Sequence, residues 1–297
     1  MSAQRMNEVV DLQRRLQAAG YVAERDLAAA LLLMLDLERP LLLEGDAGVG
    51  KTEVAKALAA VRDTKLIRLQ CYEGLDAHAA MYEWNYQRQL LAIKLLENDE
   101  RPVSLKEQDI FSERYLLKRP LLEAISCAVP PVLLIDEVDR ADEAFEAYLL
   151  ELLSDFQMSI PELGTVRAVS RPLVVITSNG TRELSDALRR RCLYQYIDYP
   201  AFDKELAIVE LKAPQAAGEL ARQVVEFVQG VRRMDLRKKP GIAETLDWAA
   251  ALLRMGIPVI DDDGAERILE SLSAPIKTRE DRAGFTREVV ARIAARC

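Results

Sequence analysis

The alternation of short apolar runs and helical stretches organises the first two thirds of the chain. Strands are expected at residues 40–44, 65–69, 132–135, 173–177 and 194–197. The runs at 132–135 and 173–177 are apolar at successive positions, as in central strands that are covered on both faces. Because helical stretches separate the strands, the pattern predicts an α/β fold with a mainly parallel, five-stranded sheet.

The pattern becomes helical after Pro200. Helices are expected at residues 204–211, 219–231, 242–253 and 280–295. In the second of these, apolar side chains recur at helical spacing, at Leu220, Val224, Phe227 and Val231. We therefore expect a domain boundary near Pro200, with one domain over 1–199 and an all-helical domain over 200–297.

A glycine-rich loop follows the first expected strand and precedes a helix-forming stretch at 53–60. Its string GDAGVGKT fits G-x-x-x-x-G-K-[ST], the phosphate-binding P-loop. In that geometry backbone N–H groups and the helix N-terminus surround a phosphate, the lysine reaches the β- and γ-phosphates, and the threonine hydroxyl ligates Mg²⁺. The candidate nucleotide-binding residues are Gly45, Asp46, Ala47, Gly48, Val49, Gly50, Lys51 and Thr52.

Two carboxylates end the apolar strand at 132–135. In a P-loop enzyme, Asp136 at the strand tip would help to hold Mg²⁺ through its water shell, and Glu137 would polarise the attacking water. An apolar run before Asp-Glu is a weak signal alone, but downstream of a P-loop it becomes a strong one. The metal-site candidates are thus Thr52 and Asp136, with ATP and Mg²⁺ as the expected ligands.

Two further polar features follow in chain order. Asn179 comes after the strand at 173–177, where it could bond to both the γ-phosphate and the lytic water; an Asn in a turn is the plainer alternative. Arg189, Arg190 and Arg191 precede the last strand. Such a run is usually a solvated face, but here it could supply an arginine finger to a neighbouring subunit.

Composition narrows the functional classes. The chain has 297 residues, 50% of them hydrophobic and 30% charged, and a net charge of −8. An acidic chain without a basic, aromatic-interleaved tract makes nucleic acid an unlikely partner. The longest apolar run, at 27–35, is too short to span a bilayer, which takes roughly 20 residues. Four cysteines without C-x-x-C spacing and a lone His78 indicate neither a zinc site nor a disulfide framework, so a cytoplasmic protein is expected.

The order of these motifs resembles that of the AAA+ ATPases. Walker A corresponds to 45–52, Walker B to Asp136 and Glu137, sensor 1 to Asn179, and the arginine finger to Arg191, with Arg190 as second choice. The string DEVDRA at 136–141 is similar to the D-E-x-N-R-A of the MoxR branch. Within that branch, three segments look like the accessory ATPase of carbon monoxide dehydrogenase and other molybdenum hydroxylases: 73–76, 81–86 and 238–245.

The resemblance implies a P-loop αβα sandwich with a small helical lid. It also implies an ATPase that works as a hexameric ring and remodels a metalloenzyme client, such as a molybdenum hydroxylase, during cofactor insertion. A protein with a von Willebrand factor A domain is the implied partner. A nucleic-acid motor and a nucleotide-dependent scaffold with little turnover are the alternatives.

The chain departs from the family where many relatives carry a sensor-2 arginine. Glu244 aligns there, with Arg237, Lys238 and Lys239 just upstream. By analogy only, residues 20–22 are expected to lie on the adenine side of the nucleotide site.

The resemblance also implies two insertions, at about 72–90 and 157–168. The second reads as a β-hairpin. In the first, Tyr82, Trp84 and Tyr86 would share one face if the segment is extended, and would form an exposed contact surface unless they pack against the insertion's own helix.

Overall fold

The computed structural model describes residues 3–76, 80–96, 101–261 and 264–296. His78 therefore lies outside the described residues. The chain divides into two compact units. The first contains Met1–Val9, Arg25–Glu44 and Val54–Tyr196, and the second contains Val10–Glu24, Gly45–Glu53 and Ile197–Cys297.

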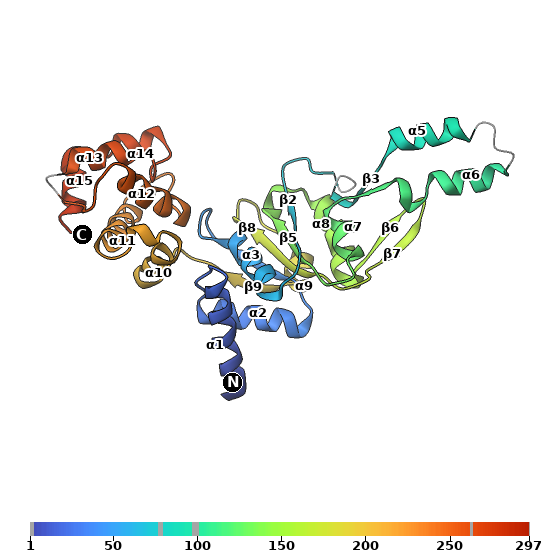
Figure 1. Cartoon of the computed structure of the whole chain (residues 1–297), viewed down its shortest axis with the longest axis horizontal. Coiled ribbons are helices and arrows are strands. Elements are labelled where there is room, and N and C mark those ends of the chain that lie inside the picture. The colour runs from blue at the N-terminus through green and yellow to red at the C-terminus, as the bar shows by residue number, and fades with distance from the viewer. Residues whose placement is uncertain (1–2, 77–79, 97–100, 262–263, 297) are drawn as a thin grey trace. The chain divides into compact units, whose positions relative to one another are not determined.

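The first unit is built on a five-stranded parallel sheet with the strand order β2-β5-β8-β1-β9 (Figure 1). Its strands are β1 (Leu41–Glu44), β2 (Leu66–Gln70), β5 (Val132–Asp136), β8 (Leu173–Ser178) and β9 (Leu193–Tyr196). All five strands lie within about a residue of the expected positions, and the prediction of an α/β fold with a parallel sheet is confirmed.

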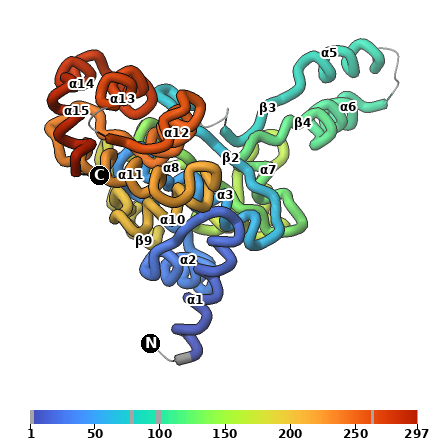
Figure 2. Tube along the Cα trace, turned by 60° about the vertical axis from the view of Figure 1, so that its left-hand side comes forward, coloured from blue at the N-terminus to red at the C-terminus, as the bar shows by residue number. Residues whose placement is uncertain are grey.

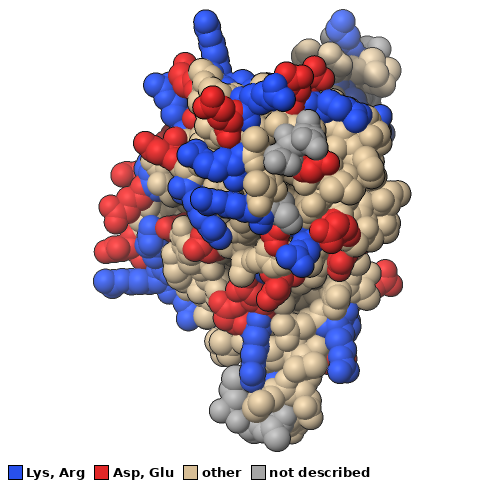
Figure 3. Space-filling view, turned by 90° about the vertical axis from the view of Figure 1, so that its left-hand side faces the viewer, with Lys and Arg blue, Asp and Glu red and all other residues tan. Residues whose placement is uncertain are grey.

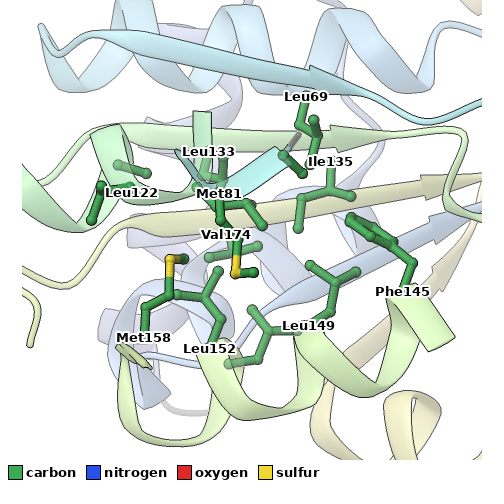
Figure 4. Packing of buried hydrophobic residues seen from close by; sticks show 14 of the residues in the cluster. Leu69, Met81, Leu122, Leu133, Ile135, Phe145, Leu149, Leu152, Met158 and Val174 are labelled. Carbon is green, nitrogen blue, oxygen red and sulfur yellow. The ribbon is translucent and has the colours of Figure 1, made fainter. Parts of the chain in front are cut away.

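Both faces of the sheet are covered. Successive leucines of β1 are buried completely, although their side chains point to opposite faces. On one face, Leu133 and Ile135 of β5 and Val174 of β8 belong to the same cluster as Phe145 and Leu149 of helix α8 (Figure 4). This packing fixes the ends of the strands, and with them the polar residues at those ends.

The helices of this part of the chain connect the strands or precede them. They are α1 (Ala3–Ala18, which continues into the second unit), α2 (Arg25–Leu37), α3 (Lys51–Arg62, which begins in the second unit), α7 (Pro120–Ser126), α8 (Glu143–Asp155) and α9 (Asp186–Arg191). Short 3₁₀ turns lie at Glu113–Tyr115 and Val138–Arg140.

An excursion between β2 and β5 consists of a two-stranded ribbon and two helices. Strands β3 (Tyr82–Trp84) and β4 (Leu116–Lys118) pair antiparallel, and α5 (Tyr86–Leu95) and α6 (Val103–Ile110) lie side by side beyond them (Figures 1 and 2). The ribbon and helices reach Lys118, past the end of the expected segment at 72–90.

The three aromatic residues of this excursion do not form one exposed patch. Tyr82 and Trp84 are buried, with their rings 6.3 Å apart and nearly perpendicular, and Trp84 also packs edge-on against Phe111. Only Tyr86, where the strand has given way to α5, is exposed. The alternative in which the rings pack inside the excursion therefore describes the first two.

A second antiparallel ribbon precedes β8. Strands β6 (Gln157–Ile160) and β7 (Gly164–Arg167) pair across a tight turn that closes at Gly164. Met158 and Ile160 on β6 are buried in the same cluster as α8, which ties the base of this hairpin to the sheet.

The second unit contains a helical bundle after Ile197. Its helices are α10 (Phe202–Lys212), α11 (Glu219–Arg232), α12 (Ile242–Arg254), α13 (Ala265–Ser271), α14 (Arg279–Ala283) and α15 (Arg287–Ala294), with a 3₁₀ turn at Pro214–Ala216. Their core is centred on Phe227 and Trp248, whose rings lie 4.7 Å apart. The indole Nε1–H donates to Ser271 Oγ at 2.8 Å, so this buried polar atom is satisfied.

The prediction of one helix over 280–295 is wrong. Helix α14 ends before Gly284, and Thr286 begins α15 as its N-cap, its side chain accepting a hydrogen bond from the Val289 N–H. A threonine that bonds to the backbone three residues ahead favours a helix start over a helix interior.

Candidate nucleotide site

The P-loop packs closely against the backbone of Ile197, and its lysine bonds to carbonyls of the loop. A Cβ at Gly45 would lie 2.0 Å from the carbonyl oxygen of Ile197, so no residue with a side chain fits at that position. Lys51 is buried, and its Nζ donates to the carbonyls of Gly45 and Asp46, both at 2.7 Å. The lysine therefore holds its ammonium charge over the loop whose N–H groups would receive a phosphate.

The sheet register brings the candidate polar residues to one edge. Ile135 of β5 pairs with Ile176 of β8, and Glu44 of β1 pairs with Ser178. Asp136 is the last residue of β5 and Thr177 is the last but one of β8, so both lie at the carboxyl ends of adjacent strands. In open α/β sheets this edge is where ligands bind.

Asp136 is fixed by two neighbouring strands. Its Oδ1 accepts a hydrogen bond from Thr177 Oγ1 of β8 at 2.5 Å, and its Oδ2 accepts from Arg68 Nε and Nη2 of β2 at 3.0 and 2.5 Å. The side chain is only 3% exposed. A buried carboxylate needs such partners, because an uncompensated charge there is costly. Asp136 is consequently held in one orientation at the strand tip.

Glu137 stands at a turn in the backbone. It adopts a left-handed conformation with φ of 55°, and its N–H donates to Thr177 Oγ1 at 2.9 Å. Its carboxylate is 30% exposed and contacts Arg140 Nε at 2.8 Å and Gln70 Nε2 at 3.1 Å. Among the two strand-tip carboxylates, Glu137 is thus the one that water reaches, as a group that activates water requires.

Asn179 follows β8 directly and is anchored through its backbone. Its N–H donates to Asp139 Oδ1 at 3.1 Å, while the Thr181 N–H and hydroxyl donate to Asp139 Oδ2 at 3.0 and 2.6 Å. Burial opposes ionisation of Asp139, but the bonds from Thr181 and Asn179 outweigh it and lower the pKa of this carboxyl below its ordinary value. Asp139 thereby ties the loop after β8 to the turn after β5.

Replacing Asp139 with Asn is expected to lower the free energy of unfolding by about 2 kcal/mol at neutral pH, because hydrogen bonds to a charged group are lost. The lowered pKa makes this contribution present above the unfolded value of about 3.9 and lost as the pH falls through the folded value. Thermal unfolding midpoints of both proteins should therefore converge on acidification. Asp142→Asn is the matched control, since Asp142 caps α8 and Asn caps equally well. A difference that grows in acid would contradict this role.

The three arginines of α9 have different surroundings. Arg189 Nη2 lies 3.5 Å from the Glu44 carboxylate within the same chain. Arg190 and Arg191 are exposed, and Arg191 contacts the Ser154 hydroxyl. The side chain of Arg39 donates to the carbonyls of Arg190 at 2.7 Å and Arg191 at 3.2 Å, which fixes the end of the helix that carries them.

The segment expected beside the adenine, residues 20–22, belongs to the same compact unit as the P-loop. Tyr199 lies in that unit as well, with the Arg232 guanidinium over its ring at 5.0 Å. Burial raises the pKa of Tyr199, and the negative charge of Asp46 in the P-loop adds to the effect. The second unit therefore contains the P-loop, residues 20–22 and Tyr199 together.

The donors present fit a magnesium ion that arrives with a nucleotide. Within the described part of the chain, no three His, Cys, Asp or Glu side chains gather into a group that could hold a metal. Mg²⁺ usually binds through one or two protein oxygens together with phosphates and water. The Asp136 carboxylate of the first unit and the Thr52 hydroxyl of the second unit are each an oxygen donor of this kind.

Several residues of the site were missed in the sequence. Arg68 and Thr177 bond to Asp136, and Arg39 bonds to the end of α9. These contacts depend on strand register and packing, which no local sequence motif predicts. Thr177 had a signal, because a hydroxyl residue ends an otherwise apolar strand. Cys71 lies beside the carboxylates, and burial together with the charges of Asp136, Asp139 and Glu137 raises the pKa of its thiol to about 12, so it stays protonated.

Comparison with known proteins identifies the family. A family model described as the AAA domain (dynein-related subfamily) matches residues 40–192, from the first strand to the end of the arginine run. The chain belongs to this family. It is accordingly a nucleotide-binding AAA+ ATPase.

Individual relatives are distant from this ATPase. An uncharacterised protein of Staphylococcus aureus (strain bovine RF122 / ET3-1) is 26% identical over 227 residues, which cover 74% of this chain and 78% of that protein. The RuvB Holliday junction branch migration motor of Thermotoga maritima is 18% identical, with a TM-score of 0.44 over 88% of this chain and 68% of that chain. None of the helices in the described residues has both the length and the hydropathy needed to cross a membrane.

Proposed function

We propose that this ATPase hydrolyses Mg²⁺-bound ATP to remodel a protein client, and that the client is a metalloenzyme such as a molybdenum hydroxylase during its maturation. The observation that carries the remodelling role is apolar surface on the excursion of the first unit. Helix α5 exposes Leu90, Leu91 and Leu95, and α6 exposes Val103. Exposed apolar side chains gathered on two adjacent helices are a feature of protein-binding surfaces.

The residues of the site divide the catalytic work. Lys51 and the P-loop N–H groups would hold the triphosphate. Thr52 and Asp136 would hold Mg²⁺, which would supply positive charge against the phosphates. Glu137 accepts a proton from the attacking water, and Asn179 aligns that water with the γ-phosphate. The support for these roles is the register that gathers Asp136, Thr177 and Glu44 at one edge.

The proposal that the protein forms a ring rests on the arginines of α9. Because Arg189 pairs with Glu44 in its own chain, Arg191, with Arg190 as second choice, is left to reach the γ-phosphate of a neighbouring subunit. A site completed in this way needs an oligomer, for which we propose a closed ring of six subunits. The domain over 200–297 acts as the lid, and a protein with a von Willebrand factor A domain is the proposed partner.

A nucleic-acid motor is the second candidate, because rings built on a P-loop often act on nucleic acid. The charge pattern does not favour it. On the face shown in Figure 3, Lys and Arg side chains are interspersed with Asp and Glu side chains and form no continuous basic track. Binding along a phosphate backbone relies on clustered positive charge.

Capture of the client tests the proposal. A Glu137→Gln variant, which should bind ATP without completing the cycle, is expressed in the native host and recovered with its bound proteins for mass spectrometry. We expect a molybdenum hydroxylase subunit, enriched at least tenfold over a Lys51→Ala control that cannot hold nucleotide. Recovery of nucleic acid or replication proteins in place of a metalloenzyme would contradict the client role and leave only the ATPase assignment.

A further inference from the structure

Two glycines meet where the lid helix α12 approaches the P-loop. The Ile242 N–H donates to the Gly48 carbonyl at 2.9 Å. A Cβ on Gly241 would lie 2.8 Å from both the Cα and the carbonyl oxygen of Gly48, and a Cβ on Gly48 would lie 3.0 Å from the Gly241 Cα. All three residues belong to the same compact unit. The two backbones therefore touch with no room for a side chain between them.

Space, and not backbone conformation, requires glycine at 241. Its φ of −85° and ψ of −172° lie in the extended region that any residue adopts. Gly48 differs, since its φ of 86° favours glycine by itself. An alanine at 241 would consequently keep an allowed backbone conformation. Its Cβ would collide with the P-loop backbone at Gly48, and within the lid it would lie 3.0 Å from Oε2 at the end of the flexible Glu244 side chain.

Hydrogen bonds within the lid fix the backbone on both sides of Gly241. Arg232, buried in α11, donates through Nε to the Pro240 carbonyl at 2.7 Å and pairs with the buried Glu205 carboxylate at 2.5 and 2.7 Å. Thr245 donates to Glu205 Oε1 at 2.8 Å, and its N–H bonds to the Gly241 carbonyl at 3.1 Å. A buried ion pair with satisfied hydrogen bonds fixes its neighbours in one arrangement.

The sensor-2 candidate does not supply a cation at this point. The Glu244 carboxylate accepts a hydrogen bond from the Gly241 N–H at 3.0 Å and so caps the first turn of α12. The first two N–H groups of this segment are therefore directed to Glu244 and to Gly48.

We propose that Gly241 is a positioning residue of the nucleotide site. Its missing side chain lets the first turn of α12 hold the P-loop in its phosphate-binding shape through the Ile242 N–H and the Gly48 carbonyl. This role rests on the proposed nucleotide function of the P-loop. The contact joins two backbones and includes no group that would touch the γ-phosphate. It therefore supports the binding of ADP and ATP equally.

The decisive experiment measures nucleotide affinity of the full chain by titration with a fluorescent ADP analogue and its displacement by ATP. Gly241→Ala should weaken binding of both nucleotides roughly tenfold, which corresponds to about 1.4 kcal/mol. It should raise the KM for ATP by a similar factor and leave kcat at saturation within about twofold, with an unchanged thermal midpoint. Gly230→Ala is the control, because a Cβ there meets only the Ile293 side chain within the lid.

A second pair of variants isolates the hydrogen bond. Ile242 is the first residue of α12, a position where proline is well tolerated, so Ile242→Pro removes the N–H and preserves the helix. Ile242→Ala shortens the side chain and keeps the N–H. We expect Ile242→Pro to reproduce the loss of ADP and ATP affinity and Ile242→Ala to stay within about threefold of the natural protein.

The outcomes separate this inference from the proposed function. Wild-type affinity for ADP in both Gly241→Ala and Ile242→Pro would overturn it, as would a loss confined to ATP, which would assign the segment to sensing the γ-phosphate. If Gly241→Ala does not fold, the comparison of Ile242→Pro with Ile242→Ala decides alone. Absence of nucleotide binding by the natural protein would refute the proposed function itself.

Discussion

Glu137→Gln is expected to reduce ATP turnover by a factor of roughly 10² to 10⁴, the usual contribution of a positioned general base, and to leave ATP affinity nearly unchanged. Gln has almost the same size as Glu and cannot accept the proton. The half-exposed contact of Glu137 with Arg140 contributes little to stability, so the fold should survive its loss. The measurements are steady-state phosphate release and the Kd for ATP.

The control is Glu143→Gln, an exposed carboxylate in the first turn of α8, which should turn over ATP normally. Turnover by Glu137→Gln close to that of the natural protein would remove Glu137 from the mechanism. It would also favour the alternative in which the protein is a scaffold whose nucleotide is hardly hydrolysed.

Arg191→Ala is expected to cost turnover roughly a thousandfold while ATP binding is spared, because an arginine finger acts on the charge of the transition state. The same change at Arg190 should have a smaller effect. Arg189→Ala should not reproduce it, since that side chain pairs with Glu44 in its own chain. Phosphate release is measured at protein concentrations where the assembly is present.

Mixing two inactive variants tests whether the finger acts between subunits. When Arg191→Ala and Glu137→Gln proteins are combined, some interfaces join an intact Glu137 of one subunit to an intact Arg191 of the next. Turnover should then rise well above that of either variant alone. Mixtures that stay inactive would contradict a contribution in trans, and unchanged turnover of Arg191→Ala would move the role to Arg190 or dismiss it.

Much of the fold follows from local patterns. Fully apolar runs such as 132–135 are typical of buried strands, and the helical stretches between them favour a parallel sheet. The failures lie where local and tertiary signals compete. Thr286 stopped a helical pattern at 280–295 by capping a new helix, and Trp84 turned inward because Phe111, distant in sequence, offered a partner.

The sequence by itself determined the family and the identity of the P-loop residues, because a phosphate-binding loop needs glycines, a lysine and a threonine at fixed spacing. Only the tertiary structure decided which groups support them. Arg68 and Thr177 reach Asp136 through the register of three strands, and Gly241 meets Gly48 across nearly two hundred residues of chain. Such contacts depend on backbone approach and burial, which are properties of the packed chain and leave no local pattern in the sequence.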